Sequence, residues 1–102
     1  MMNASDLLEA YAAEEIGNNT KIIYQSTTGA IPVKIVSSDI TDIDLKTNRG
    51  DAKTVTMKDI VKLFLDDTIV GSTEIGLCKD DEEVRELEIV SISEEVIIFT
   101  TL

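Results

Sequence analysis

The sequence contains no histidine and no tryptophan, and it has only one cysteine and one proline. Without histidine there is no catalytic triad of the usual kind, no imidazole general base and no imidazole metal ligand. The single cysteine, Cys78, excludes an intrachain disulfide and a cysteine-based zinc site, and it is typical of a small core residue in a reducing cytoplasm. Phosphate-binding loops and nucleophile elbows are missing too. We therefore expect no enzymatic activity, no cofactor and no metal.

Long apolar runs are also missing. The longest ones fall far short of the length that spans a bilayer. The N-terminal MMNASDLLEA has neither the basic region nor the long apolar region of a secretory signal. We therefore expect a cytoplasmic protein with no membrane contact. With 43% hydrophobic and 28% charged residues in 102, the composition is that of a globular chain, and residues 1–102 are expected to form a single domain.

The charge is strongly one-sided, with 20 acidic and 9 basic residues and a formal net charge of −11. One stretch departs from this excess, because residues 46–62 hold only two acids beside their five bases: Lys46, Arg49, Lys53, Lys58 and Lys62. The acid favours solubility. It also admits two sharper interpretations. Either the surface repels nucleic acid everywhere except at the basic segment, or the protein mimics DNA and blocks a nucleic-acid-binding partner.

The first half of the chain predicts a helix followed by strands. Asn3 with Asp6 resembles a helix N-cap with an acid three residues on, and apolar residues at helical spacing predict a helix over residues 4–16. A turn at Thr28-Gly29 separates two predicted strands, and a third follows: residues 20–27, 31–37 and 40–45.

The middle of the chain is ambiguous. Apolar residues at helical spacing predict a short helix over residues 57–65, and Thr56 with Asp59 forms a capping-box-like pair in front of it. A strand at residues 61–65 is the competing interpretation. Residues 68–78 are expected to be extended, in one or two pieces.

The chain finishes on LEIVSISEEVIIFTTL, two β-branched runs that predict a hairpin around Ser93-Glu94-Glu95. Its last strand is apolar on both faces, and a free edge on such a strand promotes aggregation. In one interpretation a second copy of the chain covers it, and in the other it is a central strand of a monomer. The first interpretation predicts an oligomer interface from this hairpin: Val90, Ile92, Val96, Ile98 and Phe99.

Several stretches together resemble the Sm/LSm/Hfq-like family. DLLEAYAAEEIGNNTKIIYQSTTG is similar to that family's helix, first strand and glycine turn, VKIVSSDITDIDLKT to its first motif, and the final hairpin to the strands around its second motif. The resemblance implies an α+β, mainly β fold. An N-terminal helix would precede a strongly bent five-stranded antiparallel sheet, or open barrel. Residues 46–84 would form an expanded connection that holds the short helix before the last hairpin.

The same resemblance implies a function. Family members form rings that bind single-stranded RNA, so we expect weak binding of single-stranded RNA or DNA, a role in RNA or DNA processing, and a homo-oligomeric ring of about five to seven subunits. The expected nucleic-acid contacts are Ser38, Asp39, Thr41, Asp42, Arg49, Lys53 and Ser93. Ser93-Glu94-Glu95 replaces the family's Arg-Gly. The alternative is an acidic protein–protein interaction protein or DNA-mimic inhibitor, a composition that small phage proteins often have.

Overall fold

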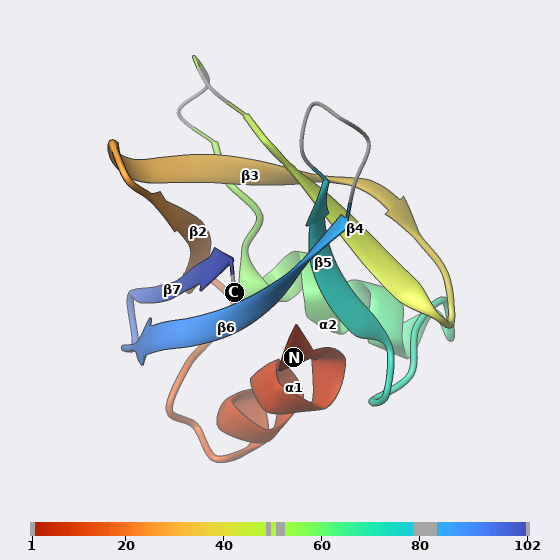
Figure 1. Cartoon of the computed structure of the whole chain (residues 1–102). Helices are drawn as coiled ribbons and strands as arrows, with labels where there is room; N and C mark the ends of the chain where they lie inside the picture. The colour runs from red at the N-terminus through yellow and green to blue at the C-terminus, as the bar shows by residue number, and fades with distance from the viewer. Residues whose placement is uncertain (1, 49, 51–52, 79–83, 102) are drawn as a thin grey trace.

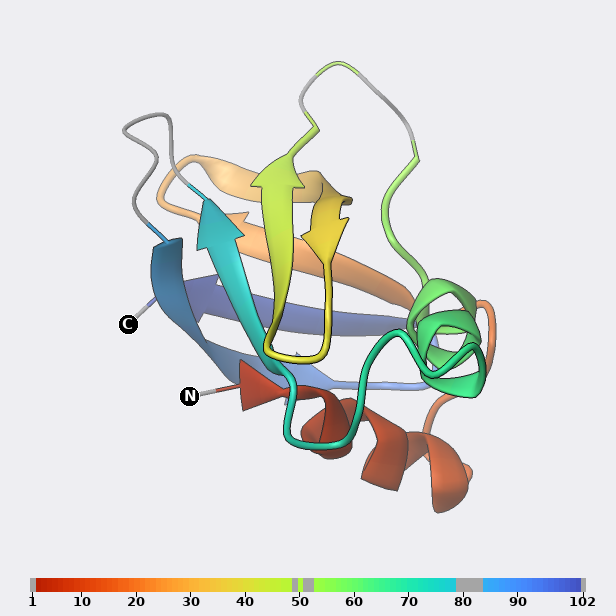
Figure 2. The ribbon, with the colours of Figure 1, turned by 90° about the vertical axis from the view of Figure 1, so that its right-hand side faces the viewer.

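The computed structural model describes residues 2–48, 50, 53–78 and 84–101. Within them it contains two helices and seven strands, with the strands curled into a barrel and the two helices next to each other at its side (Figures 1 and 2). In chain order the elements are β1 (Met2–Asn3), α1 (Ala4–Ala12), β2 (Lys21–Ser26), β3 (Gly29–Ser38), β4 (Asp42–Thr47), α2 (Met57–Leu65), β5 (Glu74–Cys78), β6 (Val84–Ile92) and β7 (Val96–Thr101).

Six of the strands form a closed barrel. The order is β5-β4-β3-β2-β7-β6, and a further pairing between β5 and β6 closes the ring, while β1 adds a short pairing to β5. Two pairs, β2 with β7 and β4 with β5, run parallel. The predicted α+β, mainly β class is confirmed. The predicted five-stranded open antiparallel arrangement is wrong.

The sixth strand, β5, lies within residues 46–84, the expected expanded connection, in the part where residues 68–78 were predicted to be extended. In β5, Ile75 and Leu77 are buried, so the strand is held by the core. Gly76 between them faces β6, and a Cβ there would lie 2.5 Å from Cγ1 of Val84. The missing side chain therefore lets β6 approach closely enough to close the barrel.

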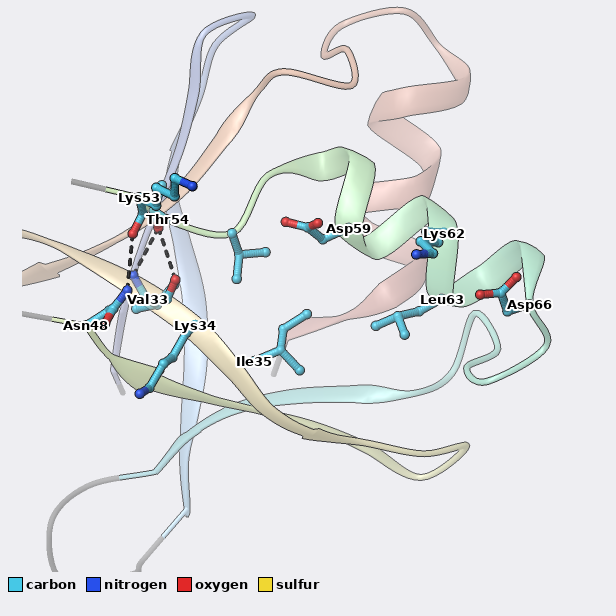
Figure 3. A pocket seen from close by; sticks show the side chains of 11 residues that line it. Val33, Lys34, Ile35, Asn48, Lys53, Thr54, Asp59, Lys62, Leu63 and Asp66 are labelled. Atoms are coloured by element: carbon cyan, nitrogen blue, oxygen red, sulfur yellow. Dashed lines mark hydrogen bonds between the residues drawn. The ribbon is translucent and has the colours of Figure 1, made fainter. Parts of the chain in front are cut away.

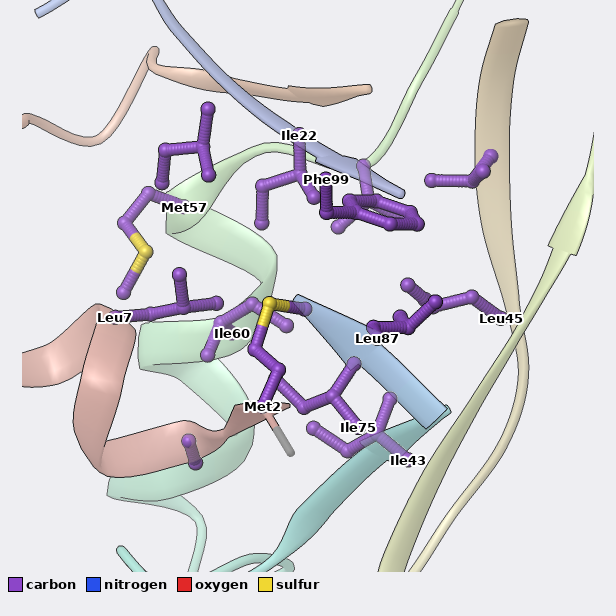
Figure 4. Packing of buried hydrophobic residues seen from close by; sticks show 14 of the residues in the cluster. Met2, Leu7, Ile22, Ile43, Leu45, Met57, Ile60, Ile75, Leu87 and Phe99 are labelled. Atoms are coloured by element: carbon purple, nitrogen blue, oxygen red, sulfur yellow. The ribbon is translucent and has the colours of Figure 1, made fainter. Parts of the chain in front are cut away.

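One continuous apolar core fills the barrel and the space beneath the helices (Figure 4). The largest side chains that it buries completely are Phe99, Met2, Leu7, Ile22, Ile43, Leu45, Met57, Ile60, Ile69, Leu77, Leu87 and Ile97. The Phe99 ring stacks on Tyr24 with centroids 5.7 Å apart. Each such side chain contributes roughly 1.5–3 kcal/mol when it leaves water, so aliphatic burial compensates for the scarcity of aromatics.

Helix α1 begins as predicted. Asn3 Oδ1 accepts the Asp6 N–H (3.2 Å) and Asp6 Oδ2 accepts the Asn3 N–H (2.9 Å), which together form a capping box. Leu7 on its inner face is fully buried. The helix ends at Ala12, earlier than predicted, because Glu14 adopts a left-handed backbone with φ 62°.

Helix α2 confirms the helical interpretation of the middle segment, and the competing strand at residues 61–65 is wrong. The Thr56 N–H donates to Asp59 Oδ2 (3.0 Å) at its first turn. Met57 and Ile60 are buried, so periodic burial against the core decides in favour of the helix. Across the described ranges, no helix has the length and apolar character needed to cross a membrane.

Strand β7 is a central strand of this barrel. It pairs in parallel with β2 along one edge and antiparallel with β6 along the other. Ile97 and Phe99 point inward and are fully buried, whereas Val96 and Ile98 are half-buried on the outer face. The edge that was expected to pair with a second copy is therefore filled by the chain itself. Phe99, one of the predicted interface residues, has no exposed side-chain surface in the single chain.

Candidate binding groove beside strand β3

Part of the predicted nucleic-acid site forms the tight turn between β3 and β4. Oδ1 of Asp39 accepts the Thr41 hydroxyl (2.6 Å), the Thr41 N–H (2.8 Å) and the Asp42 N–H (2.9 Å). These bonds, led by that of the Thr41 hydroxyl, lower the pKa of the Asp39 carboxyl. Ser38, half-buried, is the last residue of β3. The hydrogen bonds hold the turn together and leave Asp39 with fewer lone pairs for a ligand.

Ser93 lies in the other predicted loop, the turn between β6 and β7. Its N–H donates to the Val96 carbonyl (2.9 Å), and its hydroxyl oxygen accepts the Val96 N–H (3.2 Å). The β3–β4 and β6–β7 turns lie on opposite sides of the molecule (Figure 1). A single chain thus does not bring Asp39 and Ser93 together. Arg49, also predicted as a contact, lies outside the described residues.

Lys53, by contrast, borders a substantial hollow. A groove of about 700 Å³, here called the β3–α2 groove, runs between strand β3 and helix α2 (Figure 3). The residues that line it are Val33, Lys34, Ile35, Asn48, Lys53, Thr54, Val55, Asp59, Lys62, Leu63 and Asp66. Ile35 and Leu63 are half-buried side chains packed against the core, so the floor of the groove is apolar.

The groove exists because β2 and β3 separate. β2 pairs with β3 only as far as Pro32. Thr54, in the segment after β4, then lies between the two strands. Its hydroxyl accepts the Val33 N–H (2.9 Å) and donates to the Ile22 carbonyl (2.6 Å). The Val55 N–H donates to the Val33 carbonyl (3.0 Å). Beyond Thr54 and Val55, the space beside β3 is the β3–α2 groove.

The backbone of Ile35 faces this groove. The N–H and carbonyl of Val33 bond to Thr54 and Val55 on one edge of β3. The Pro32 carbonyl accepts the Asn48 N–H (2.8 Å) on the opposite edge. Backbone groups alternate between the two edges of a strand. Ile35, two residues after Val33, therefore points its N–H and carbonyl into the groove. No described strand pairs with this edge of β3 beyond Val33, so the groove has one free strand edge as a wall.

The lining of the groove has more basic than acidic residues, unlike the chain as a whole. Three lysines and two aspartates line it, whereas the whole chain carries −11. Asp59 already accepts the N–H and hydroxyl of Thr56 at the start of α2. On the outer face of the barrel, Lys34 lies directly opposite Lys46 across the β3–β4 ladder. Like charges in this position repel each other, which favours an anionic group beside them.

The remaining predicted interface residues lie on another face. A second hollow of about 730 Å³, here called the outer hollow, lies over β2 and β7, and its lining includes Ile23 and Ile98, which are adjacent in register. Val96 also lines it. Val90 and Ile92 are exposed on β6. These residues are available on the surface, unlike Phe99.

Two observations concern metal binding and the reactivity of the thiol. The described residues contain no group of three or more side chains suited to holding a metal ion. Burial raises the pKa of the Cys78 thiol, and the nearby Asp44 carboxylate raises it further. A protonated thiol is a poor nucleophile.

Lys53, a predicted contact, lines the groove, whereas Ile35 and Leu63, which line it as well, were not predicted as site residues. The signal for Leu63 was present, because it lies on the half-buried face of an amphipathic helix. No signal marked Ile35, since its open backbone edge arises from the lack of a neighbouring strand among the described residues. No protein-family model, curated protein or solved structure matches this chain. The resemblance to Sm-like proteins rests on the sequence pattern alone.

Proposed function

We propose that the protein is a non-enzymatic protein-interaction module that captures an extended segment of a partner protein in the β3–α2 groove. The observation that carries this proposal is the free edge of β3 at Ile35, which faces helix α2 across an apolar floor. Extended peptides bind such edges as an additional strand, with main-chain hydrogen bonds for affinity and side-chain pockets for specificity.

The dimensions of the groove support a short, moderate-affinity contact. The free edge offers the N–H and carbonyl of Ile35, and each net hydrogen bond contributes about 0.5–1.5 kcal/mol. Apolar contact with Ile35 and Leu63 adds the burial of two half-exposed side chains. Ordering the peptide offsets part of this gain. We expect a dissociation constant of roughly 10–100 µM, equivalent to about 5.5–7 kcal/mol.

A pair of peptides tests this mechanism. The probe is a short alternating valine–glutamine peptide, and its control is the same peptide with N-methyl groups on every second residue. N-methylation removes backbone donors on one edge and keeps the side chains. In a titration followed by amide chemical shifts, we expect the parent to move the signals of Ile35 and Leu63 and the methylated peptide to move neither. Equal binding of both peptides would contradict strand addition.

A second candidate function is the weak binding of single-stranded RNA or DNA by a homo-oligomer. The observation in its favour is that Lys34 and Lys46 lie side by side on the outer face, and that Lys34 also lines the groove together with Lys53 and Lys62. Phosphate contacts of this kind supply most of the affinity of non-specific nucleic-acid binding. The ring and its role in RNA or DNA processing belong to this candidate, and its subunits would have to meet through surfaces other than the edges of β7.

Salt and charge separate the two candidates. Nucleic-acid binding predicts an affinity that falls with added salt, and a loss of binding when Lys53 is changed to Glu. It gives no reason for the parent and the N-methylated peptide to differ in affinity, because the ligand would be a nucleic acid and not a peptide. If a labelled single-stranded oligonucleotide binds the protein and Lys53→Glu abolishes that binding, the second candidate replaces the first.

A further inference from the structure

We infer that the segment captured in the β3–α2 groove alternates apolar and acidic side chains, an inference that rests on the proposed function. Its apolar positions would face the core side of the groove. Its acidic positions would lie on the outer face of the barrel, beside the lysines. The partner is thus defined by chemistry: an extended acidic β-strand segment of another protein.

The alternation follows from the two faces of β3. Ile35 turns its half-buried side chain inward, whereas Lys34 is exposed and extends away from α2 on the other face (Figure 3). Side chains of an added strand alternate in the same way. Every second residue of the segment would therefore contact Ile35 and Leu63, and the residues between would lie next to Lys34 on the outer face.

The preference for acid follows from the charges on that outer face. Lys34 and Lys46 are directly opposite each other, so an acidic group beside them relieves their repulsion. Lys53 and Lys62 line the same groove. A negative side chain on the outer face gains contact with Lys34, whereas a positive one adds a further like charge.

The two aspartates of the groove restrict where the acid can lie. Asp59 is held by its hydrogen bonds to Thr56. Asp66 lies at the exposed C-terminal end of α2, so it repels acid at that end of the groove. We therefore place the acidic positions of the segment near Lys34 and Lys53, at the end of the groove that begins with Val33.

This inference runs against the charge of the whole chain, which makes it testable. A net charge of −11 attracts basic partners in general, as the DNA-mimic alternative requires. At physiological salt the Debye length is about 8 Å, so charges on distant surfaces are largely screened and the local lysines decide the preference. The groove therefore selects a partner of the opposite kind from the one that the overall charge attracts.

The experiment compares three peptides that differ only in their polar residue: alternating valine–glutamate, valine–glutamine and valine–lysine. Fluorescence polarisation at physiological salt gives the affinity of each. We expect the glutamate peptide to bind roughly three- to tenfold more tightly than the glutamine peptide, because exposed ion pairs have modest strength. Lys34→Gln should remove most of that difference. Lys58→Gln is the matched control, because Lys58 is exposed on α2 and does not line the groove.

The possible results distinguish the acidic preference from strand capture itself. Equal affinity for the glutamate and glutamine peptides overturns the acidic preference and leaves strand capture standing. Tightest binding of the lysine peptide also overturns the preference and favours a basic partner. If none of the three peptides binds, both the inference and the proposed function are wrong.

Discussion

Two hollows of almost equal volume, about 700 and 730 Å³, differ in what their backbones can offer a ligand. In the lining of the outer hollow, Ile23 and Ile98 belong to strands that are paired on both sides. In the β3–α2 groove, Ile35 belongs to a strand with one open edge. The two hollows thus have similar volumes and apolar linings, but they differ in the backbone hydrogen-bonding groups that are available to a ligand. Of these two hollows, only the β3–α2 groove has a described strand edge without a neighbouring strand, which is what strand addition requires.

The largest expected effect comes from proline in the paired strand. Ile98→Pro removes an N–H from a strand with neighbours along both edges, so a ladder hydrogen bond is lost and the ring clashes with the sheet. We expect a loss of about 3 kcal/mol or more in the free energy of unfolding, measured by urea denaturation. A stable, cooperative Ile98→Pro barrel would contradict the central position of β7.

Proline at the open edge of β3 is expected to affect peptide binding more than stability. At Ile35 the lost N–H points into the groove and belongs to no described ladder, and edge positions tolerate proline. We expect Ile35→Pro to stay folded, with a smaller loss of stability, and to lose at least tenfold in affinity for the valine–glutamine peptide. Far-ultraviolet circular dichroism and the peptide titration check the two halves of this prediction. Ile35→Val, which keeps the N–H and the β-branched shape, should bind as the parent does.

The sequence predicted those features whose signal is local. Helix α2 followed from periodic apolar residues, and the final hairpin from two β-branched runs. The closed barrel could not be predicted, because the parallel pairing of β4 with β5 joins segments about thirty residues apart in ways that no single stretch reveals. The edge at Ile35 could not be predicted for a related reason. An unpaired edge is a property of missing neighbours, whereas sequence patterns report which face of a strand is buried.

Assembly gives the next test, because it concerns the outer hollow alone. If a ring forms through this apolar face, a charge on that face should disrupt it. We expect Ile98→Lys to reduce the mass of any oligomer seen by light scattering at tens of micromolar, while peptide binding in the β3–α2 groove persists. A parent protein that is already monomeric under these conditions ends the ring hypothesis and leaves the groove unaffected.

The smallest expected effect concerns low pH, and it distinguishes the β3–β4 turn from the β6–β7 turn, whose Glu94 and Glu95 line the outer hollow. The β3–β4 turn, at the open end of β3, is closed by the Asp39 carboxylate, whereas the β6–β7 turn is closed by the neutral hydroxyl of Ser93. Folding lowers the pKa of Asp39 from its ordinary 3.8. The carboxylate therefore stabilises the folded turn fully above that value, and this contribution is lost as pH falls through the lower, folded pKa.

We therefore expect the amides of Thr41 and Asp42 to lose protection below about pH 4, while the amide of Val96 keeps its own. Amide hydrogen exchange followed by NMR measures both turns in one sample. Asp39→Asn is the matched variant, because its side-chain oxygen still accepts these hydrogen bonds but does not titrate. In that variant the acid-dependent loss at Thr41 should disappear. If Thr41 and Val96 lose protection together in the parent protein, the change reflects unfolding of the whole barrel, and the carboxylate has no separate role in holding the open end of β3.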